Sequence, residues 1–144
     1  MTVLGRIFHH GCERTTTGKR AAGGLLVGTL AGAALTAIAT GVASPLAGII
    51  AFPIALVIWS VGLFALGAPG WWVLHALGVR CQQAAMIYGG VMTYAVCVAY
   101  VWLDGPHPFE PRMLWSIPML GLTAIGVAVG WIVAKVAYEP AKTT

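Results

Sequence analysis

Charged residues are scarce in this chain. They make up only 8% of its 144 residues, whereas hydrophobic residues make up 59%. A soluble domain carries about 25% charged residues. No acidic or basic residue occurs from residue 21 to residue 79, so this stretch leaves no room for a soluble domain. The sequence therefore indicates an integral membrane protein with most of its length in or at the bilayer.

Cysteine is scarce as well, with only Cys12, Cys81 and Cys97. They form neither a C-x-x-C motif nor an even framework, so no structural disulfide network is expected. Quinone-linked thiol oxidoreductases need paired loop cysteines, and small multidrug exporters need a glutamate within the membrane. The chain has neither feature, so it resembles neither of these four-helix families.

Ionisable residues are missing from the centres of the apolar runs. Such residues mark proton relays and ion pathways, and a haem between helices would need a histidine within a span. Their absence argues against an ion-coupled carrier and against a haem protein. The polar groups at depth are expected to hydrogen-bond backbone carbonyls of their own or a neighbouring helix; they are Thr29, Thr36, Ser60, Tyr88, Thr93, Tyr94 and Thr123.

Four apolar runs are long enough to cross a bilayer as helices. The predicted fold is an all-α integral membrane four-helix bundle, with residues 21–144 as a single transmembrane domain after a basic arm at 1–20. The expected spans are 21–43, 46–68, 84–103 and 114–134, with an outer loop at 104–113 and a tail at 135–144. Ser44-Pro45 separates the first two spans, Pro53 is expected to kink the second, and Gly67-Ala68-Pro69-Gly70 is expected to end it.

The segment 70–83 is too short to span. Trp71, Leu74 and Leu77 fall near one face and His75 near another, which predicts a short amphipathic helix on the membrane surface between the second and third spans. Indole rings are apolar in body and polar at the N–H, so tryptophans near span ends are expected to anchor the chain at the interface. These anchors are Trp71, Trp72, Trp102 and Trp115.

The basic residues predict the orientation. Four precede the first span, one lies between the second and third, and two follow the fourth, against one in the outer connectors. Cytoplasmic segments carry the excess of lysine and arginine, so both termini are expected in the cytoplasm, and the location is expected to be a bacterial inner membrane. A secretory signal peptide is the alternative for the first span, but its apolar core is typically about 7–15 residues long, which favours an uncleaved anchor.

Small residues recur along three of the expected helices. Such stripes let helix backbones approach closely in lipid, where packing and interhelical hydrogen bonds drive association. The residues concerned are Gly24, Gly28, Gly32 and Thr36 in the first span, Gly89 and Thr93 in the third, and Gly126 and Gly130 in the fourth. The same physics serves packing within one chain or a seam between copies, so both uses stay open.

Two groups of side chains have donor atoms suited to chemistry. Asp104, His107 and Glu110 lie together on the outer loop and are interpreted as a solvated connector, with contact to a partner's outer domain as the functional alternative. His9, His10, Cys12, His75 and Cys81 have side chains that suit zinc or copper, but their spacing matches no standard site, so no metal site is predicted.

The leading functional interpretation is a non-enzymatic subunit or accessory factor of a larger membrane complex. One alternative is a homo-oligomeric pore of the holin or small-channel kind, with Thr29, Thr36 and Thr40 along its path; another is an immunity or exclusion protein that binds a membrane partner. The expected partners are the lipid bilayer and other integral membrane subunits or further copies of the chain, and not nucleic acid. No cofactor is predicted, although a lipid, quinone or pigment can lie against glycine-rich faces without leaving a motif.

Overall fold

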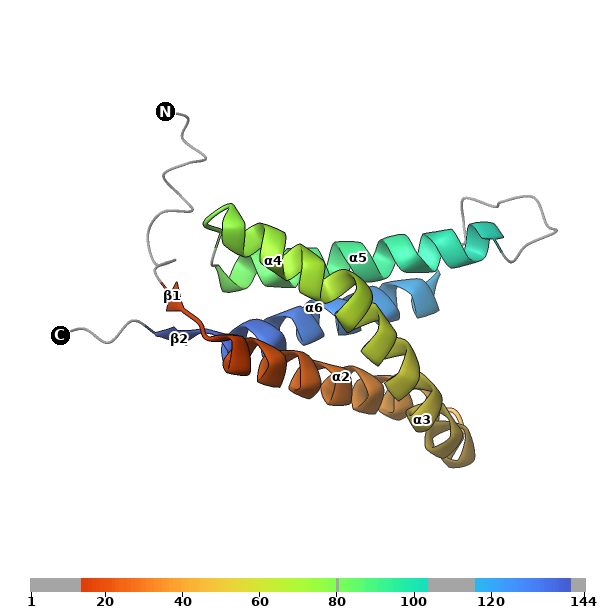
Figure 1. Ribbon diagram of the computed structural model, residues 1–144. Helices are drawn as coiled ribbons and strands as arrows, with labels where there is room; N and C mark the ends of the chain where they lie inside the picture. Colours follow the sequence, from red (N-terminus) through yellow and green to blue (C-terminus); the bar gives the residue numbers. More distant parts are fainter. Residues whose placement is uncertain (1–13, 80, 104–115, 141–144) are drawn as a thin grey trace.

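The computed structural model describes residues 14–79, 81–103 and 116–140, and helices account for most of them (Figure 1). The elements are β1 (Arg14–Thr15), α2 (Gly18–Gly41), α3 (Pro45–Gly62), the π-helical turn η1 (Leu63–Gly67), α4 (Ala68–Ala76), α5 (Gln82–Leu103), α6 (Ile117–Ala137) and β2 (Glu139–Pro140). Four helical stretches are long and apolar enough to cross a membrane. The prediction of an all-helical fold with four such helices is therefore confirmed.

The second stretch differs from its expected form. Residues Pro45–Ala76 make one continuous helical run of 32 residues, so the break expected at 67–70 is wrong. The reason lies in η1, where the Ala68 N–H donates to the Leu63 carbonyl, five residues earlier. This wider turn resets the hydrogen-bond ladder, and Pro69 then stands in the first turn of α4, where a missing N–H is tolerated.

The segment 70–83 is consequently not a separate helix. Its first part continues the second span as α4, and a turn at Gly78, with φ of +74°, leads into α5. In that turn the Val79 N–H donates to the Leu74 carbonyl at 2.9 Å, as in a Schellman motif. The exposed face of α4 is apolar, whereas His75 lies half-buried on the inner side. At about 1.5 Å per residue the whole run is about 48 Å long, which exceeds the hydrocarbon core of about 30 Å.

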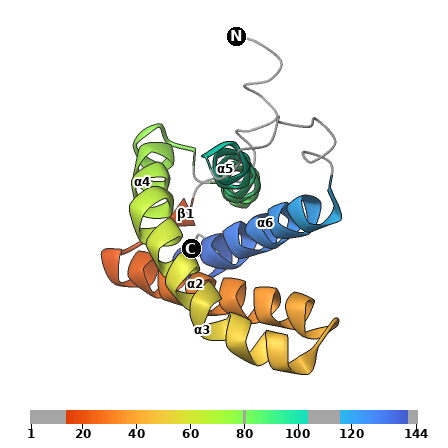
Figure 2. The same cartoon turned by 90° about the vertical axis from the view of Figure 1, so that its right-hand side faces the viewer.

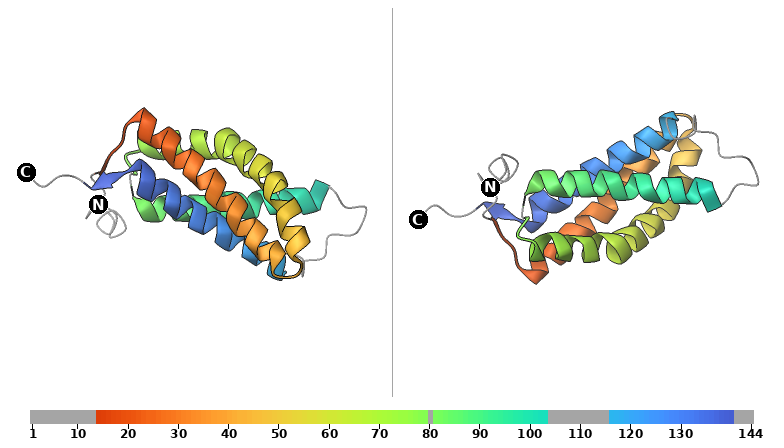
Figure 3. Two further views of the ribbon diagram at one scale, coloured as in Figure 1. Left: turned by 90° about the horizontal axis from the view of Figure 1, so that it is seen from below. Right: turned by 90° about the horizontal axis from the view of Figure 1, so that it is seen from above.

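Helices α2 and α6 form the centre of the molecule. Helix α3 packs beside α2 and α5 packs beside α6, while α2 and α6 pack against each other, so the spatial order is α3–α2–α6–α5 (Figures 2 and 3). In the most apolar stretch of α2 and in that of α6, 33% of the residues are buried within the chain. The corresponding share is 6% in each of the other two spans. The two outer spans therefore expose most of their surface.

One end of the molecule joins the beginning and the end of the described chain. Strand β1 pairs antiparallel with β2, with Thr15 opposite Glu139, and the Thr16 hydroxyl donates to the Ala137 carbonyl at 2.7 Å. This pairing holds the start of α2 beside the end of α6 (Figure 1). The described charged residues, which are Arg14, Lys19, Arg20, Lys135 and Glu139, all lie in the elements of this end. We call it the basic end.

Candidate functional site

The backbones of α5 and α6 approach each other closely at three glycines. A Cβ atom at Gly130 would collide with the Ala85 carbonyl oxygen, and one at Gly89 would collide with that of Gly126. A Cβ at Gly126 would in turn meet the Thr93 hydroxyl. Only glycine lets the two backbones approach so closely, as in other small-residue seams of membrane helices. The expected packing residues of the third and fourth spans thus meet one another directly.

The stripe on α2 also faces the inside of the chain. A Cβ at Gly24 would lie 3.0 Å from the Val133 carbonyl oxygen of α6, and one at Gly28 would collide with the Val133 side chain. A Cβ at Gly32 would lie 2.5 Å from the Trp59 ring of α3. The stripe therefore serves two helix contacts within one chain. That placement argues against its use as a seam between copies.

The hydroxyl groups along the helices are satisfied locally. Each of five donates to the carbonyl oxygen four residues earlier, namely Thr29 to Leu25, Thr36 to Gly32, Ser60 to Leu56, Thr93 to Gly89 and Thr123 to Met119, at 2.6–2.9 Å. This confirms the expected backbone bonding of these five groups. Because Thr29 is buried as well, with 4% of its surface exposed, it does not line an open path along the chain.

Tyr88 connects α5 to the π-helical turn of the second span. Its hydroxyl donates to the Leu66 carbonyl at 2.8 Å, and its ring occupies the position where a Cβ at Gly70 would lie. A π-turn leaves carbonyl groups without their usual helical partner, and turns of this kind are frequent at functional sites. Tyr88 is thus both the hydrogen-bond partner of this turn and the contact that brings α5 against it.

An aromatic cluster of three side chains lies at the basic end. The Trp71 and His75 rings of α4 stack with centroids 5.3 Å apart and planes 19° apart, and the Trp71 ring lies 6.2 Å from that of Tyr138 at the end of α6. Tyr138 is 5% exposed and belongs to the small core at this end. Within the described part of the chain, Trp71 Nε1 and His75 Nδ1 are buried without a hydrogen-bond partner.

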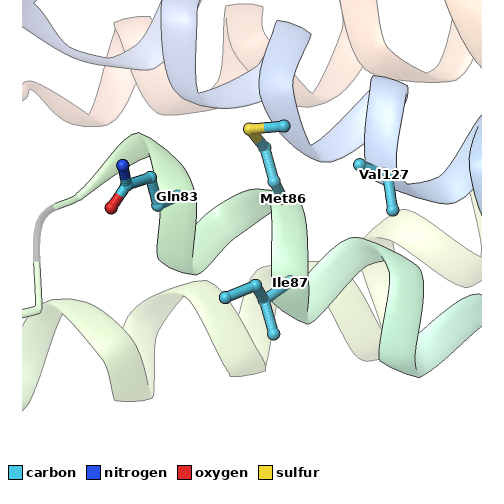
Figure 4. Close-up of a pocket in the computed structure, with 4 residues that line it drawn as sticks. All are labelled: Gln83, Met86, Ile87 and Val127. Atoms are coloured by element: carbon cyan, nitrogen blue, oxygen red, sulfur yellow. The ribbon is translucent and has the colours of Figure 1, made fainter.

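An apolar groove lies on the outer flank of the α5–α6 pair. It has a volume of about 330 Å³ and is lined by Gln83, Met86 and Ile87 of α5 and by Val127 of α6 (Figure 4). Met86 extends from α5 toward α6, and Gln83 lies at the end of the groove nearest the connection to α4 (Figure 4). The groove is open on one side, so a ligand lying in it would stay in contact with the surroundings.

The expected interface anchors have different environments. Trp72 and Trp102 are exposed, with 67% and 72% of their surface accessible, as an anchor at the headgroup level requires. Trp71 instead points into the aromatic cluster of the basic end. Trp115 and the outer-loop residues Asp104, His107 and Glu110 lie outside the described residues.

The metal-ligand candidates are mostly outside the described residues too. Of the five, only His75 and Cys81 are described, and no group of three or more histidine, cysteine or acidic side chains comes together within residues 14–79, 81–103 and 116–140. His75 stacks on Trp71. The sequence indicates no disulfide network, yet Cys81 is disulfide-bonded in the structure, whereas Cys97 is a free thiol.

No family model, curated protein or solved structure matches this chain.

Some residues that organise these contacts carry no obvious signal in the sequence. Trp59 looks like an ordinary apolar position, yet it fills the space over Gly32 of another helix. Tyr88 is expected to hydrogen-bond a carbonyl, but nothing in the sequence indicates that its ring lies over Gly70. Gly48 is a further example, because a Cβ there would lie 2.8 Å from the Gly41 Cα in the α2–α3 hairpin. A bulky aromatic residue and a distant glycine form a pair only in the folded chain.

Proposed function

We propose that this protein is a small, non-enzymatic membrane protein that acts as a subunit or accessory factor of a larger membrane complex. Its two outer spans support the proposal, because they expose most of their surface and diverge from each other. The contact between Tyr88 and Gly70 holds α5 against the second span near the basic end. Toward the other end α3 runs away from α5 (Figure 2).

Small residues line the two helices beyond this contact. Ala95 and Ala99 are exposed on α5, seven and eleven residues after Tyr88, so they continue the helix face that carries Tyr88. On α3, Gly62 lies one turn before Leu66 and has open space where its Cβ would be. The glycine faces of α2, α5 and α6 that carry Gly28, Gly89 and Gly130 are filled by the chain's own helices, whereas this one is open. A helix of a partner protein can approach closely at such a face.

The alternatives receive less support. A pore would need polar groups free to face its path, but the hydroxyls of Thr29, Thr36 and Thr40 each donate to a carbonyl of their own helix. An immunity or exclusion protein would use the same open face for an incoming membrane partner, so the identity of the partner distinguishes that role from a permanent subunit.

The proposed location is a bacterial inner membrane with the basic end in the cytoplasm. Lys19, Arg20 and Lys135 lie at that end, and short cytoplasmic segments carry the basic residues. The disulfide at Cys81 favours the opposite orientation, since disulfides persist in oxidising compartments. We give the basic residues more weight, because the number of lysines and arginines in short loops sets the orientation of a membrane protein. A fluorescent-protein fusion after residue 144 should fluoresce, and an alkaline phosphatase fusion there should be inactive; the reverse result would invert the orientation.

Purification from native membranes in mild detergent tests the main proposal. The mass of the intact particle and the identity of every co-purifying chain are the measurements. We expect a stoichiometric larger partner, and an Ala99→Leu variant should lose it because the added side chain fills the open face of α5. Ala124→Leu is the matched control, since Ala124 is exposed on α6, away from this face.

Two results would contradict the proposal. The first is a wild-type protein that emerges alone, as a monomer or as a defined oligomer of itself; an oligomer would make conductance in planar bilayers the next measurement. The second is retention of the partner by Ala99→Leu together with its loss in Ala124→Leu, which would move the contact to α6.

A further inference from the structure

The groove between α5 and α6 has a gradient of polarity along its length. Gln83 lies in the first turn of α5 at the basic end, and Met86, Ile87 and Val127 line the deeper part (Figure 4). An amide at the membrane surface and an apolar channel beneath it match the order of groups in a phospholipid, which has a polar head and acyl chains below.

A row of side chains on α6 leads from the groove to the positive charge of Lys135. Val127, Trp131 and Lys135 are four residues apart and so lie along one side of the helix. Trp131 is 40% exposed, and the Lys135 ammonium lies 4.7 Å from the centroid of its ring. A tryptophan with a lysine ammonium over its ring, both near the end of a span, is typical of a membrane–water interface.

The charge at this end fits an anion. Lys135 is exposed, and the described charged residues of this end are four basic residues and one acid, Glu139. The described cations are gathered at the basic end, and the opposite end has no described charged residue that could attract an anionic headgroup. Basic sites between membrane helices on the cytoplasmic side are where anionic headgroups bind.

We propose that this groove binds one acyl chain of an anionic phospholipid, with the phosphate beside the Lys135 ammonium and the Gln83 amide. An acyl chain suits the site better than a partner helix, because a helix with its side chains is about 10–12 Å across and the groove has a volume of only about 330 Å³. Met86 adds an unbranched, flexible side chain that adapts to a mobile chain. The inference depends on membrane insertion but not on a partner subunit.

Native mass spectrometry of the full-length protein in detergent tests this site. Phosphatidylglycerol and phosphatidylcholine with identical acyl chains are added separately, and the fraction of protein that retains one lipid is measured. We expect preferential retention of phosphatidylglycerol. Lys135→Gln should weaken its binding about fivefold, as expected for one basic residue near an anionic group, and Lys135→Arg should keep it.

Two further variants separate the site from a general effect of charge. Lys19→Gln removes the same charge at the basic end but on α2, and it should leave retention unchanged. Val127→Phe narrows the groove and should lower retention of both lipids, with circular dichroism used to verify that the variant keeps its helices. Equal retention of the two lipids by the wild type, or equal losses in Lys19→Gln and Lys135→Gln, would overturn the proposal. Because the purified chain is measured alone, this result is independent of any co-purifying partner.

Discussion

The indole nitrogen of Trp59 donates a hydrogen bond to the Thr36 hydroxyl oxygen at 3.1 Å, across the hairpin of α2 and α3. The same hydroxyl donates to the Gly32 carbonyl at 2.8 Å, so Thr36 is satisfied as both donor and acceptor. The Trp59 ring lies over Gly32, which has no side chain to displace it. One glycine thus creates the space in which a large polar-tipped ring reaches its partner away from water.

We expect Gly32→Ala to destabilise the protein. The new Cβ would lie 2.5 Å from the Trp59 ring, so the ring must shift and its hydrogen bond to Thr36 must weaken. Overpacking of this kind costs about 1–3 kcal/mol. The free energy of unfolding, measured by adding sodium dodecyl sulfate to protein in mixed micelles, should fall by that amount.

Gly23→Ala is the control for this change. Gly23 lies on the same helix, but nothing stands within 4 Å of its Cβ position. Alanine there should raise the stability by about 0.5–1 kcal/mol, because glycine is the poorer helix former. Similar effects of the two substitutions would show that the Trp59 contact does not govern the α2–α3 hairpin.

Gly130→Ala should be more harmful than Gly32→Ala. At Gly130 the obstructing atoms belong to the backbone of α5 at Ala85 and Met86, and a backbone cannot rotate away as the Trp59 side chain can. The two helices must separate, which loosens the whole α5–α6 seam. The same unfolding measurement should show a loss at or above the upper end of about 1–3 kcal/mol. Gly121→Ala on the same helix, with open space at its Cβ, should not destabilise; a loss as large as at Gly130 would contradict the close contact.

The sequence predicts the number and type of the spans because burial in lipid imposes a simple rule. A helix that satisfies its own backbone groups needs about 20 apolar residues, and the chain contains four such runs. The hydroxyl groups follow the same logic, since a buried threonine has a carbonyl of its own helix within reach. Ser44-Pro45 also marks the turn between α2 and α3, because proline is well suited to the first turn of a helix.

The continuation of the second span past 67–70 could not be predicted in this way. Glycine and proline in sequence normally end a helix. Here the π-helical turn η1 places Pro69 in the first turn of α4, where its missing N–H is tolerated. Tyr88, from another helix, donates to the Leu66 carbonyl of this turn. The aromatic cluster was equally hidden: indole chemistry predicts an exposed interface position for Trp71, whereas Tyr138, from the other end of the chain, draws it inward. Both outcomes depend on contacts between residues far apart in sequence.

A substitution at His75 can distinguish the contribution of its stacked ring to stability from the cost of its buried, unpaired nitrogen. The ring stacks on Trp71, and its buried Nδ1 has no hydrogen-bond partner among the described residues. His75→Phe keeps a ring for stacking and removes the unpaired nitrogen, so it should be neutral or stabilise by up to about 1 kcal/mol. Trp71→Ala should instead cost about 3–5 kcal/mol, because it removes the ring that packs against Tyr138. Strong destabilisation by His75→Phe would mean that Nδ1 has a polar partner in the membrane-embedded protein.

The hydrogen bond from Tyr88 to the π-turn can be measured by its removal. Tyr88→Phe leaves the ring over Gly70 and deletes only the hydroxyl that donates to the Leu66 carbonyl. Interhelical hydrogen bonds in membrane proteins contribute on average about 0.6 and at most about 1.7 kcal/mol, and the loss should fall in this range. Tyr94→Phe removes a hydroxyl from the same helix at a position without a described hydrogen bond, so it should change the stability less.

A double-mutant cycle with Gly70→Ala then tests whether the hydroxyl and the glycine act together. Alanine at Gly70 would place its methyl group on the Tyr88 hydroxyl, so in the wild-type background the ring must move and its hydrogen bond breaks. In the Tyr88→Phe background that bond is already lost and the collision is smaller, so the same substitution should cost less. The expected coupling is at least about 0.5 kcal/mol, the range found for residues in direct contact. Additive effects, measured by the same unfolding titration, would show that α5 is positioned by its seam with α6 alone and that the Tyr88 contact with the π-turn is incidental.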